Sequence, residues 1–138
     1  MTVHELIATH PHPTSADRDT LLRCIDDCFD CAASGISCAD ACLGEDDVRD
    51  LVRCIRRCLD CADVCDTAGR VVTRQTEPDF GLIRLALEAC VEACRVCGEE
   101  CERHADRHEH CRICGATCRR CEQSCNDLLG TIPTPEQS

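Results

Sequence analysis

Cysteines recur along this chain at the spacing of one face of an α-helix. From Cys111 to Cys125 the sequence reads CRICGATCRRCEQSC, and its five cysteines are separated by steps of 3, 4, 3 and 4 residues. Residues three and four apart lie next to each other on a helix surface. A helix with this stripe therefore buries thiols where an ordinary helical bundle buries leucine or isoleucine.

The same pattern occurs four times and accounts for every cysteine in the chain. The repeat CxxxCxxCxxxC is complete in the second and third segments and extended in the fourth. It is interrupted at Gly35 in the first, where we expect a cysteine to be tolerated in place of the glycine. The 18 candidate metal ligands are Cys24, Cys28, Cys31, Cys38, Cys42, Cys54, Cys58, Cys61, Cys65, Cys90, Cys94, Cys97, Cys101, Cys111, Cys114, Cys118, Cys121 and Cys125.

These segments predict four helices joined by short loops, so that consecutive helices run antiparallel. The expected fold class is all-α, an antiparallel up-down-up-down four-helix bundle with a cysteine-lined core. We divide the chain into an N-terminal segment (1–14), the bundle (15–130) and a frayed C-terminal tail (131–138). The predicted residues at helix starts are Thr14 with Asp17, Asp46 and Asp47, Pro78, and Asp106 with Glu109.

The charge and the apolar content of the chain limit the partners and the cellular location that we expect for this protein. A net charge of −11 argues against a nucleic-acid partner, which selects a basic surface. No run approaches the ~18 apolar residues of a membrane span. The first 13 residues lack the basic and apolar regions of an export signal. We therefore expect a cytoplasmic location, where thiols stay reduced and many cysteines indicate metal or redox chemistry.

The two ends of the predicted bundle differ. Extending the stripes beyond the cysteines gives apolar residues at one end, and gives His104 and His108 at the other. We expect a closed plug at the first end and a polar mouth at the second, with a tube of thiols between them. Glu45, Asp46 and Asp47, near the mouth, are interpreted as capping and solvating groups. The predicted plug residues are Leu21, Ala68, Val72, Phe80, Ile83, Leu87 and Leu128.

Thiolates are soft ligands that select Cu(I), zinc or iron–sulfur clusters. Continuous ladders of thiol pairs suit Cu(I), and if each thiolate bridges two ions the capacity approaches one Cu(I) per cysteine, on the order of 18. Each Cu⁺ replaces one thiol proton, so a filled core gains no net charge. Zinc in four-cysteine sites would leave a charge of about −2 at each site in a dry core. Cu(I) is therefore the predicted ligand.

With these repeats, residues 15–129 resemble the bacterial four-helix-bundle copper storage proteins, Cys-rich bundles that hold many Cu(I) ions. The resemblance implies that the 18 cysteines bind copper and that His104, His108 and His110 lie near the open end. We therefore count these three histidines as candidate metal-site residues, as ligands or at the entry. It also implies the cytosolic kind of member, a homotetramer.

The predicted function is storage and detoxification of Cu(I) by a protein that is not an enzyme, with copper delivered by a copper chaperone or a small thiol. One alternative is a zinc-buffering or metal-regulated structural protein, which would bind about four ions per chain. Another is a thiol redox enzyme, which requires one partly exposed thiol with a lowered pKa. No cysteine in the sequence is set apart in that way.

Overall fold

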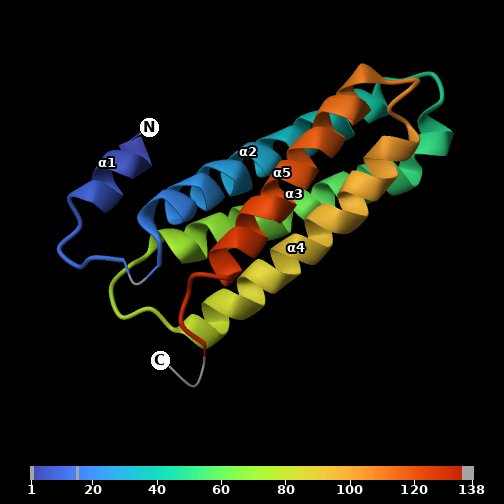
Figure 1. The fold of residues 1–138 in the computed structure, drawn as a ribbon. Coiled ribbons are helices and arrows are strands. Elements are labelled where there is room, and N and C mark those ends of the chain that lie inside the picture. The colour runs from blue at the N-terminus through green and yellow to red at the C-terminus, as the bar shows by residue number, and fades with distance from the viewer. Residues whose placement is uncertain (1, 15, 135–138) are drawn as a thin grey trace.

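Every regular element of the computed structural model, which describes residues 2–14 and 16–134, is a helix (Figure 1). A short helix precedes four long ones, and a 3₁₀ turn lies before the second long helix. The elements are α1 (Thr2–Ala8), α2 (Arg18–Leu43), η1 (Val48–Leu51), α3 (Val52–Thr73), α4 (Phe80–Arg103) and α5 (Glu109–Leu129).

The four long helices alternate in direction and form a square bundle. Both α2 and α4 pack against α3 and α5, so α2 and α4 lie across one diagonal. This confirms the predicted fold class. The short α1 is attached to the outside of α2, where the imidazole Nε2 of His4 lies 2.8 Å from Oδ2 of Asp26.

Two helices begin at aspartates, close to the predicted positions. Asp17 caps α2 by accepting a hydrogen bond from the backbone N–H of Thr20 (2.9 Å), whereas Thr14 lies outside the helix. Asp79 caps α4 in the same way, so Pro78 precedes the helix instead of lying in its first turn. A short acidic side chain with extended backbone satisfies an otherwise unpaired N–H, which explains both starts.

The predicted caps of the other two helices are wrong. No side-chain hydrogen bond caps α5, because the residue before it is His108 and the Glu109 carboxylate pairs with Arg112. Asp47 stands before η1 without capping it, because its carboxylate contacts His108. In both places a side-chain partner competes successfully for the carboxylate.

The apolar plug lies where the sequence predicts it, at the end formed by the start of α2 and the end of α5. Leu87 is fully buried there, and Phe80 is half-buried. Ile132 joins the plug with only 7% of its surface exposed, so the start of the tail packs against the bundle instead of fraying. Residues 135–138 lie outside the described part. The buried plug residues are Leu21, Ala68, Val72, Ile83, Leu87, Leu128 and Ile132.

Gly35 faces α3 and not the thiol tube. A Cβ atom at this position would lie 2.6 Å from the backbone carbonyl oxygen of Cys58 and 3.4 Å from Cβ of Ala62. The expectation that cysteine is tolerated here is therefore wrong, because the colliding atom belongs to a helix backbone that cannot rotate away. The glycine allows α2 and α3 to approach closely.

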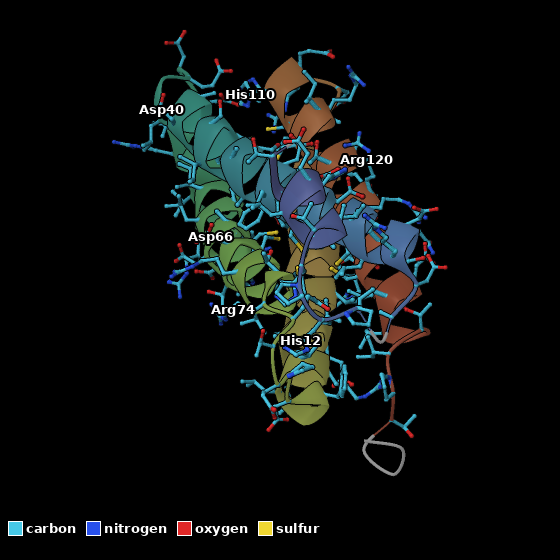
Figure 2. All side chains as sticks on the ribbon, turned by 90° about the vertical axis from the view of Figure 1, so that its left-hand side faces the viewer. His12, Asp40, Asp66, Arg74, His110 and Arg120 are labelled. Atoms are coloured by element: carbon cyan, nitrogen blue, oxygen red, sulfur yellow. The ribbon has the colours of Figure 1, made fainter. Side chains whose placement is uncertain are left out.

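Most charged side chains lie on the outside of the bundle, and the sulfur atoms lie inside it. Figure 2 shows Asp40, Asp66 and Arg120 projecting outward from the helices. The sulfur atoms in this view lie between the helices. Among the described residues, no helix combines the length and apolar character that crossing a bilayer requires.

Candidate metal centre

All 18 thiols are buried, and none is in a disulfide. The most exposed of them, Cys38, shows only 3% of its surface. Each long helix contributes its cysteine stripe to the centre of the square, so the thiols fill the space that leucines occupy in other bundles. The result is a tube of sulfur that runs from the plug toward the opposite end.

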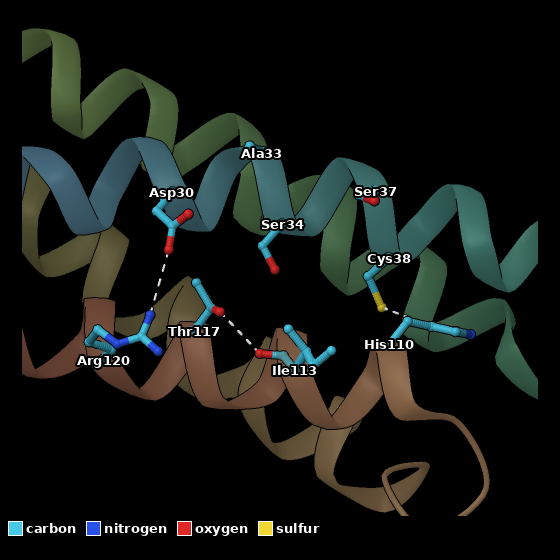
Figure 3. Close-up of a pocket in the computed structure, with 9 residues that line it drawn as sticks. All are labelled: Asp30, Ala33, Ser34, Ser37, Cys38, His110, Ile113, Thr117 and Arg120. Carbon is cyan, nitrogen blue, oxygen red and sulfur yellow. Dashed lines mark hydrogen bonds and ion pairs between the residues drawn. The ribbon is translucent and has the colours of Figure 1, made fainter. Parts of the chain in front are cut away.

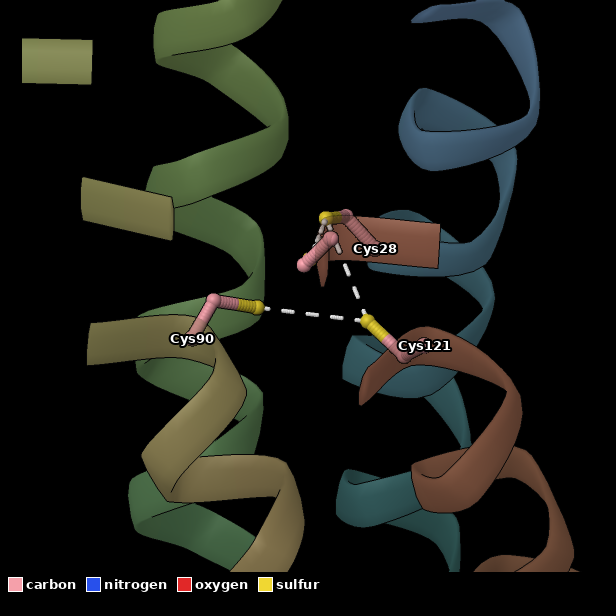
Figure 4. Close-up of side chains that lie close together, drawn as sticks. Cys28, Cys90 and Cys121 are labelled. Carbon is pink, nitrogen blue, oxygen red and sulfur yellow. Dashed lines mark hydrogen bonds between the residues drawn. The ribbon is translucent and has the colours of Figure 1, made fainter. Parts of the chain in front are cut away.

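Sulfur atoms within the tube approach one another across helices as well as along them. The Sγ atoms of Cys65 on α3 and Cys94 on α4 are 3.6 Å apart. In Figure 4 Cys121 on α5 bridges two helices, with its Sγ 3.9 Å from that of Cys90 and 4.0 Å from that of Cys28. Soft ligands are thus packed at the separations that one metal ion can span.

The tube contains several four-thiol sets, groups of four cysteines whose Sγ atoms all lie within 4.8 Å of one another. These sets overlap, because some cysteines belong to more than one of them. Cys121, Cys38 and Cys58 each belong to two sets, so isolated four-cysteine sites cannot all be filled at once. Overlapping sets suit ions that share bridging thiolates. Five of the sets are Cys28–Cys90–Cys121–Cys125, Cys31–Cys65–Cys94–Cys121, Cys38–Cys54–Cys58–Cys101, Cys38–Cys42–Cys54–Cys111 and Cys58–Cys97–Cys101–Cys114.

Sulfur spacing alone does not choose the metal. A Zn–S bond of ~2.3 Å gives a tetrahedral edge of about 3.8 Å, which matches the separations seen here. Charge and the sharing of thiolates distinguish the two metals. A monovalent ion that replaces one proton per thiol leaves this dry core neutral, whereas zinc with four thiolates does not.

Without metal, the Cys42 and Cys111 thiols near the mouth carry their protons at neutral pH. Burial raises the pKa of the Cys42 thiol to about 11. Burial likewise raises the pKa of Cys111, and the neighbouring Cys54 and Cys42 raise it further. A metal ion that binds these groups must displace their protons.

The mouth is lined by an imidazole held between two carboxylates. Nδ1 of His108 lies 2.8 Å from Oε2 of Glu45, and its Nε2 lies 3.0 Å from Oδ2 of Asp47. The hydrogen bond with Asp47, followed by the charges of Asp47 and Glu45, raises the pKa of His108. Glu45 and Asp47 are therefore part of the mouth, and the interpretation of both as capping groups is wrong.

His110 is the imidazole that reaches the thiols. Its Nδ1 lies 3.5 Å from Sγ of Cys38 and 3.6 Å from Sγ of Cys111, while its Nε2 lies 2.8 Å from Oε2 of Glu45. Its ring stacks on that of His108 with centroids 5.3 Å apart. His110 is off the cysteine stripe in sequence, but in the first turn of α5 its side chain turns toward α2.

His104 is buried at the same end but is held away from the sulfurs. Its Nδ1 accepts a hydrogen bond from Nη2 of Arg107 (2.9 Å), since a guanidinium only donates. Its Nε2 then carries the proton and donates to Oε2 of Glu100 (3.0 Å). Among the described residues no thiol is hydrogen-bonded to His104. Sequence reasoning missed Glu100, although its i, i+4 spacing from His104 was a usable signal.

The arrangement of buried thiols agrees with a comparison against known families. Residues 17–130 match the sequence profile described as copper storage protein. This chain belongs to the copper storage protein family.

Solved structures of a related protein have the same fold. The copper storage protein of Streptomyces lividans, in a structure loaded with 10 copper equivalents, is 46% identical and has a TM-score of 0.92; the match covers 94% of this chain and 99% of that one. A structure of the cytosolic copper storage protein from the same organism with five coppers is 48% identical, with a TM-score of 0.82, and covers 83% and 96% of the two chains.

A curated relative from another bacterium has no assigned function. An uncharacterised cysteine-rich protein of Bacillus subtilis is 36% identical over 105 residues, which is 76% of this chain and 92% of that protein.

In this member of the copper storage protein family, the structure sorts the predicted site residues into two groups. The 18 cysteines and His110 form one continuous set of donor atoms. His104 and His108 lie beside that set and are engaged by carboxylates and by Arg107.

Proposed function

We propose that this protein stores and detoxifies Cu(I) by binding many ions to the cysteine thiolates inside its bundle. The observation that carries the proposal is the overlap of four-thiol sets along one buried tube. Overlap requires shared thiolates, and sharing is the coordination mode of Cu(I) clusters, not of separate zinc sites. The structure of the Streptomyces lividans relative loaded with 10 copper equivalents supports the proposal that this core also binds many copper ions.

The proposed ligands are the 18 cysteines listed from the sequence, together with Nδ1 of His110. Complete sharing gives a capacity on the order of 18 Cu(I) per chain. Each ion displaces one thiol proton, so loading does not build up charge in the core. Catalysis is not part of the proposal, in keeping with the match to the copper storage protein family.

Copper is proposed to enter at the mouth, since the plug closes the opposite end. His110 is the first ligand, because it contacts Cys38 and Cys111. His108 assists after losing the proton that Glu45 and Asp47 stabilise. His104 positions the mouth through Glu100 and Arg107 instead of binding the stored metal.

The setting is proposed to be the cytoplasm, as for the Streptomyces relative, with a copper chaperone or a small thiol as donor. A homotetramer is the proposed assembly. Four large apolar side chains on the outer face of the α2–α3 pair are available for it, with 43–63% of their surface exposed: Ile36, Leu43, Val52 and Leu59.

The test is an anaerobic titration of the fully reduced protein with Cu(I) against a chromophoric competitor for Cu(I). Saturation near one Cu(I) per thiol is expected. A parallel titration with Zn²⁺ provides the control. Saturation at about four ions with either metal, or displacement of bound Cu(I) by Zn²⁺, would favour the zinc-buffering alternative and reject copper storage.

A further inference from the structure

A groove of about 510 Å³ lies along the seam between α2 and α5 and reaches the mouth at His110 (Figure 3). It is bounded at one end by the ion pair of Asp30 with Arg120 (3.5 Å) and at the other by the contact of Cys38 with His110. Between these ends α2 presents small side chains. The lining residues are Asp30, Ala33, Ser34, Ser37, Cys38, His110, Ile113, Thr117 and Arg120.

The groove leads from solvent to the thiol tube. Cys38 is the most exposed of the 18 thiols, it lines the groove, and it belongs to two of the four-thiol sets. His110 lines the same groove and also contacts Cys111 inside the tube. A copper ion brought into the groove therefore meets one thiol and one imidazole that both belong to the storage core.

The groove offers polar groups that this chain does not use. The hydroxyls of Ser34 and Ser37 have no hydrogen-bond partner among the described residues. Thr117, by contrast, donates to the carbonyl of Ile113. The guanidinium of Arg120 is more than half exposed and is paired only at 3.5 Å, so it is accessible to a carboxylate of a ligand.

We propose that this groove binds a Cu(I) complex of a low-molecular-weight thiol and passes its copper to Cys38. This rests on the proposed storage function and specifies the chemical class of the donor. The volume lies within the ~300–1,000 Å³ of typical small-molecule sites. Cys38 and His110 line one end of the groove, so a small ligand that occupies the groove lies next to both donor atoms.

The transfer is a ligand exchange without change of oxidation state. The bond between copper and the donor sulfur breaks as the bond between copper and Sγ of Cys38 forms. The proton of the Cys38 thiol leaves with the departing donor thiolate, which is released as a thiol. Copper remains Cu(I) throughout, and His110 Nδ1 is close enough to Cys38 to take the place of the second donor ligand.

The test fills the groove and compares two copper donors. Ser37→Phe places a ring in the groove from an exposed position, and Ser34→Phe does so from a half-buried one. The matched control is Ala89→Phe, an exposed position on α4 outside the groove. Stopped-flow loading is measured with the bis-glutathione complex of Cu(I) and with Cu(I) supplied as its acetonitrile complex.

We expect Ser37→Phe to slow loading from the glutathione complex by about tenfold, equivalent to about 1.4 kcal/mol of lost contacts. Loading from the acetonitrile complex, the final capacity, and the Ala89→Phe control should be unchanged. S-methylglutathione, which cannot bind Cu(I) through a thiolate, should compete with the glutathione complex in wild type but not in Ser37→Phe.

Wild-type rates with the glutathione complex in both groove variants would overturn the proposal. Equal slowing with both donors would also overturn it, because the substitutions would then act on copper binding instead of on the donor. Either result leaves the measured capacity, and therefore the storage function, intact. A wild-type capacity of only a few ions would reject storage itself.

Discussion

At Gly35 the backbones of α2 and α3 come so close that a single Cβ atom would lie 2.6 Å from the carbonyl oxygen of Cys58. One missing side chain thus decides how tightly two helices pack. His110 shows the same dependence on local placement, because the imidazole that contacts thiols is the one off the cysteine stripe. At this scale, function depends on which neighbour each side chain meets.

We expect Gly35→Ala to destabilise the reduced, metal-free protein. Alanine gains up to about 1 kcal/mol in helix propensity, but overpacking against an immobile backbone costs about 1–3 kcal/mol. The net loss of unfolding free energy is measured by denaturant titration. Gly44→Ala is the control, because its Cβ would lie 3.5 Å from the nearest oxygen, an ordinary contact. Equal stability of both variants would contradict the packing role of Gly35.

His110→Ala is expected to weaken the first-bound Cu(I) by at least about tenfold, since even the loss of an outer-shell partner typically costs about 10–100-fold in metal affinity. His104→Ala should leave that affinity unchanged, because both of its ring nitrogens are engaged by Glu100 and Arg107. Competition titrations at a low ratio of copper to protein measure the Cu(I) affinity of both variants. A larger effect from His104→Ala would show that the mouth rearranges when copper binds.

At the scale of the helices, each cysteine stripe continues at one end into apolar residues and at the other toward polar ones. The stripe of α4 begins with the buried Ile83 and Leu87, passes through its four cysteines and ends at Glu100 and His104. A single helix face therefore supplies plug residues, buried thiols and mouth residues in order. Stability is expected to be concentrated in the plug, because cysteine side chains are small.

Leu87→Ala should lower the free energy of unfolding by about 2–5 kcal/mol, the usual cost of removing a fully buried leucine. Leu87 is 0% exposed, so its removal leaves a cavity in the plug. Copper capacity should not change, because no thiol is lost. The two quantities are measured by thermal unfolding of the metal-free protein and by Cu(I) titration. A stable variant with reduced capacity would place Leu87 in the binding core instead.

For the whole molecule, the outer surface and the core serve different purposes. The outer surface carries most of the charged side chains and the net charge of −11, whereas the proposed exchange of one thiol proton for each Cu(I) adds no charge to the tube. Two seams of the bundle also differ, because the α2–α5 seam carries the groove and the α2–α3 pair carries the exposed apolar side chains. An assembly through α2–α3 leaves the groove on a separate face.

Copper loading at pH 7 is expected to release about one proton per Cu(I). The raised pKa of Cys42, about 11, keeps its thiol protonated at this pH, so copper must displace the proton. The apparent affinity should therefore fall as pH is lowered, by about tenfold per pH unit for each proton displaced. An indicator dye in weakly buffered anaerobic solution measures the release. Far fewer protons would mean that the thiolates form before copper arrives.

Replacing Ile36 and Leu59 by glutamate should dissociate the proposed tetramer, because two charges would be buried against an apolar partner face. Leu85→Glu on α4 is the control, since Leu85 is 65% exposed and lies outside that face. Light scattering of the metal-free proteins measures the mass. A wild-type monomer, or a tetramer unaffected by the double substitution, would reject this interface.

The cysteine spacing by itself determined the number of long helices, their buried faces and the chemistry of the core, because a 3–4 repeat permits only one helix face and thiolate selects soft metals. It also located the plug and the level of the mouth. Only the tertiary structure decided that Gly35 serves helix contact, that Glu45 and Asp47 hold His108, and that His110 reaches Cys38. These features depend on contacts between residues that are distant in the chain. The residue spacing within one helix does not specify which side chains of the neighbouring helices it will contact.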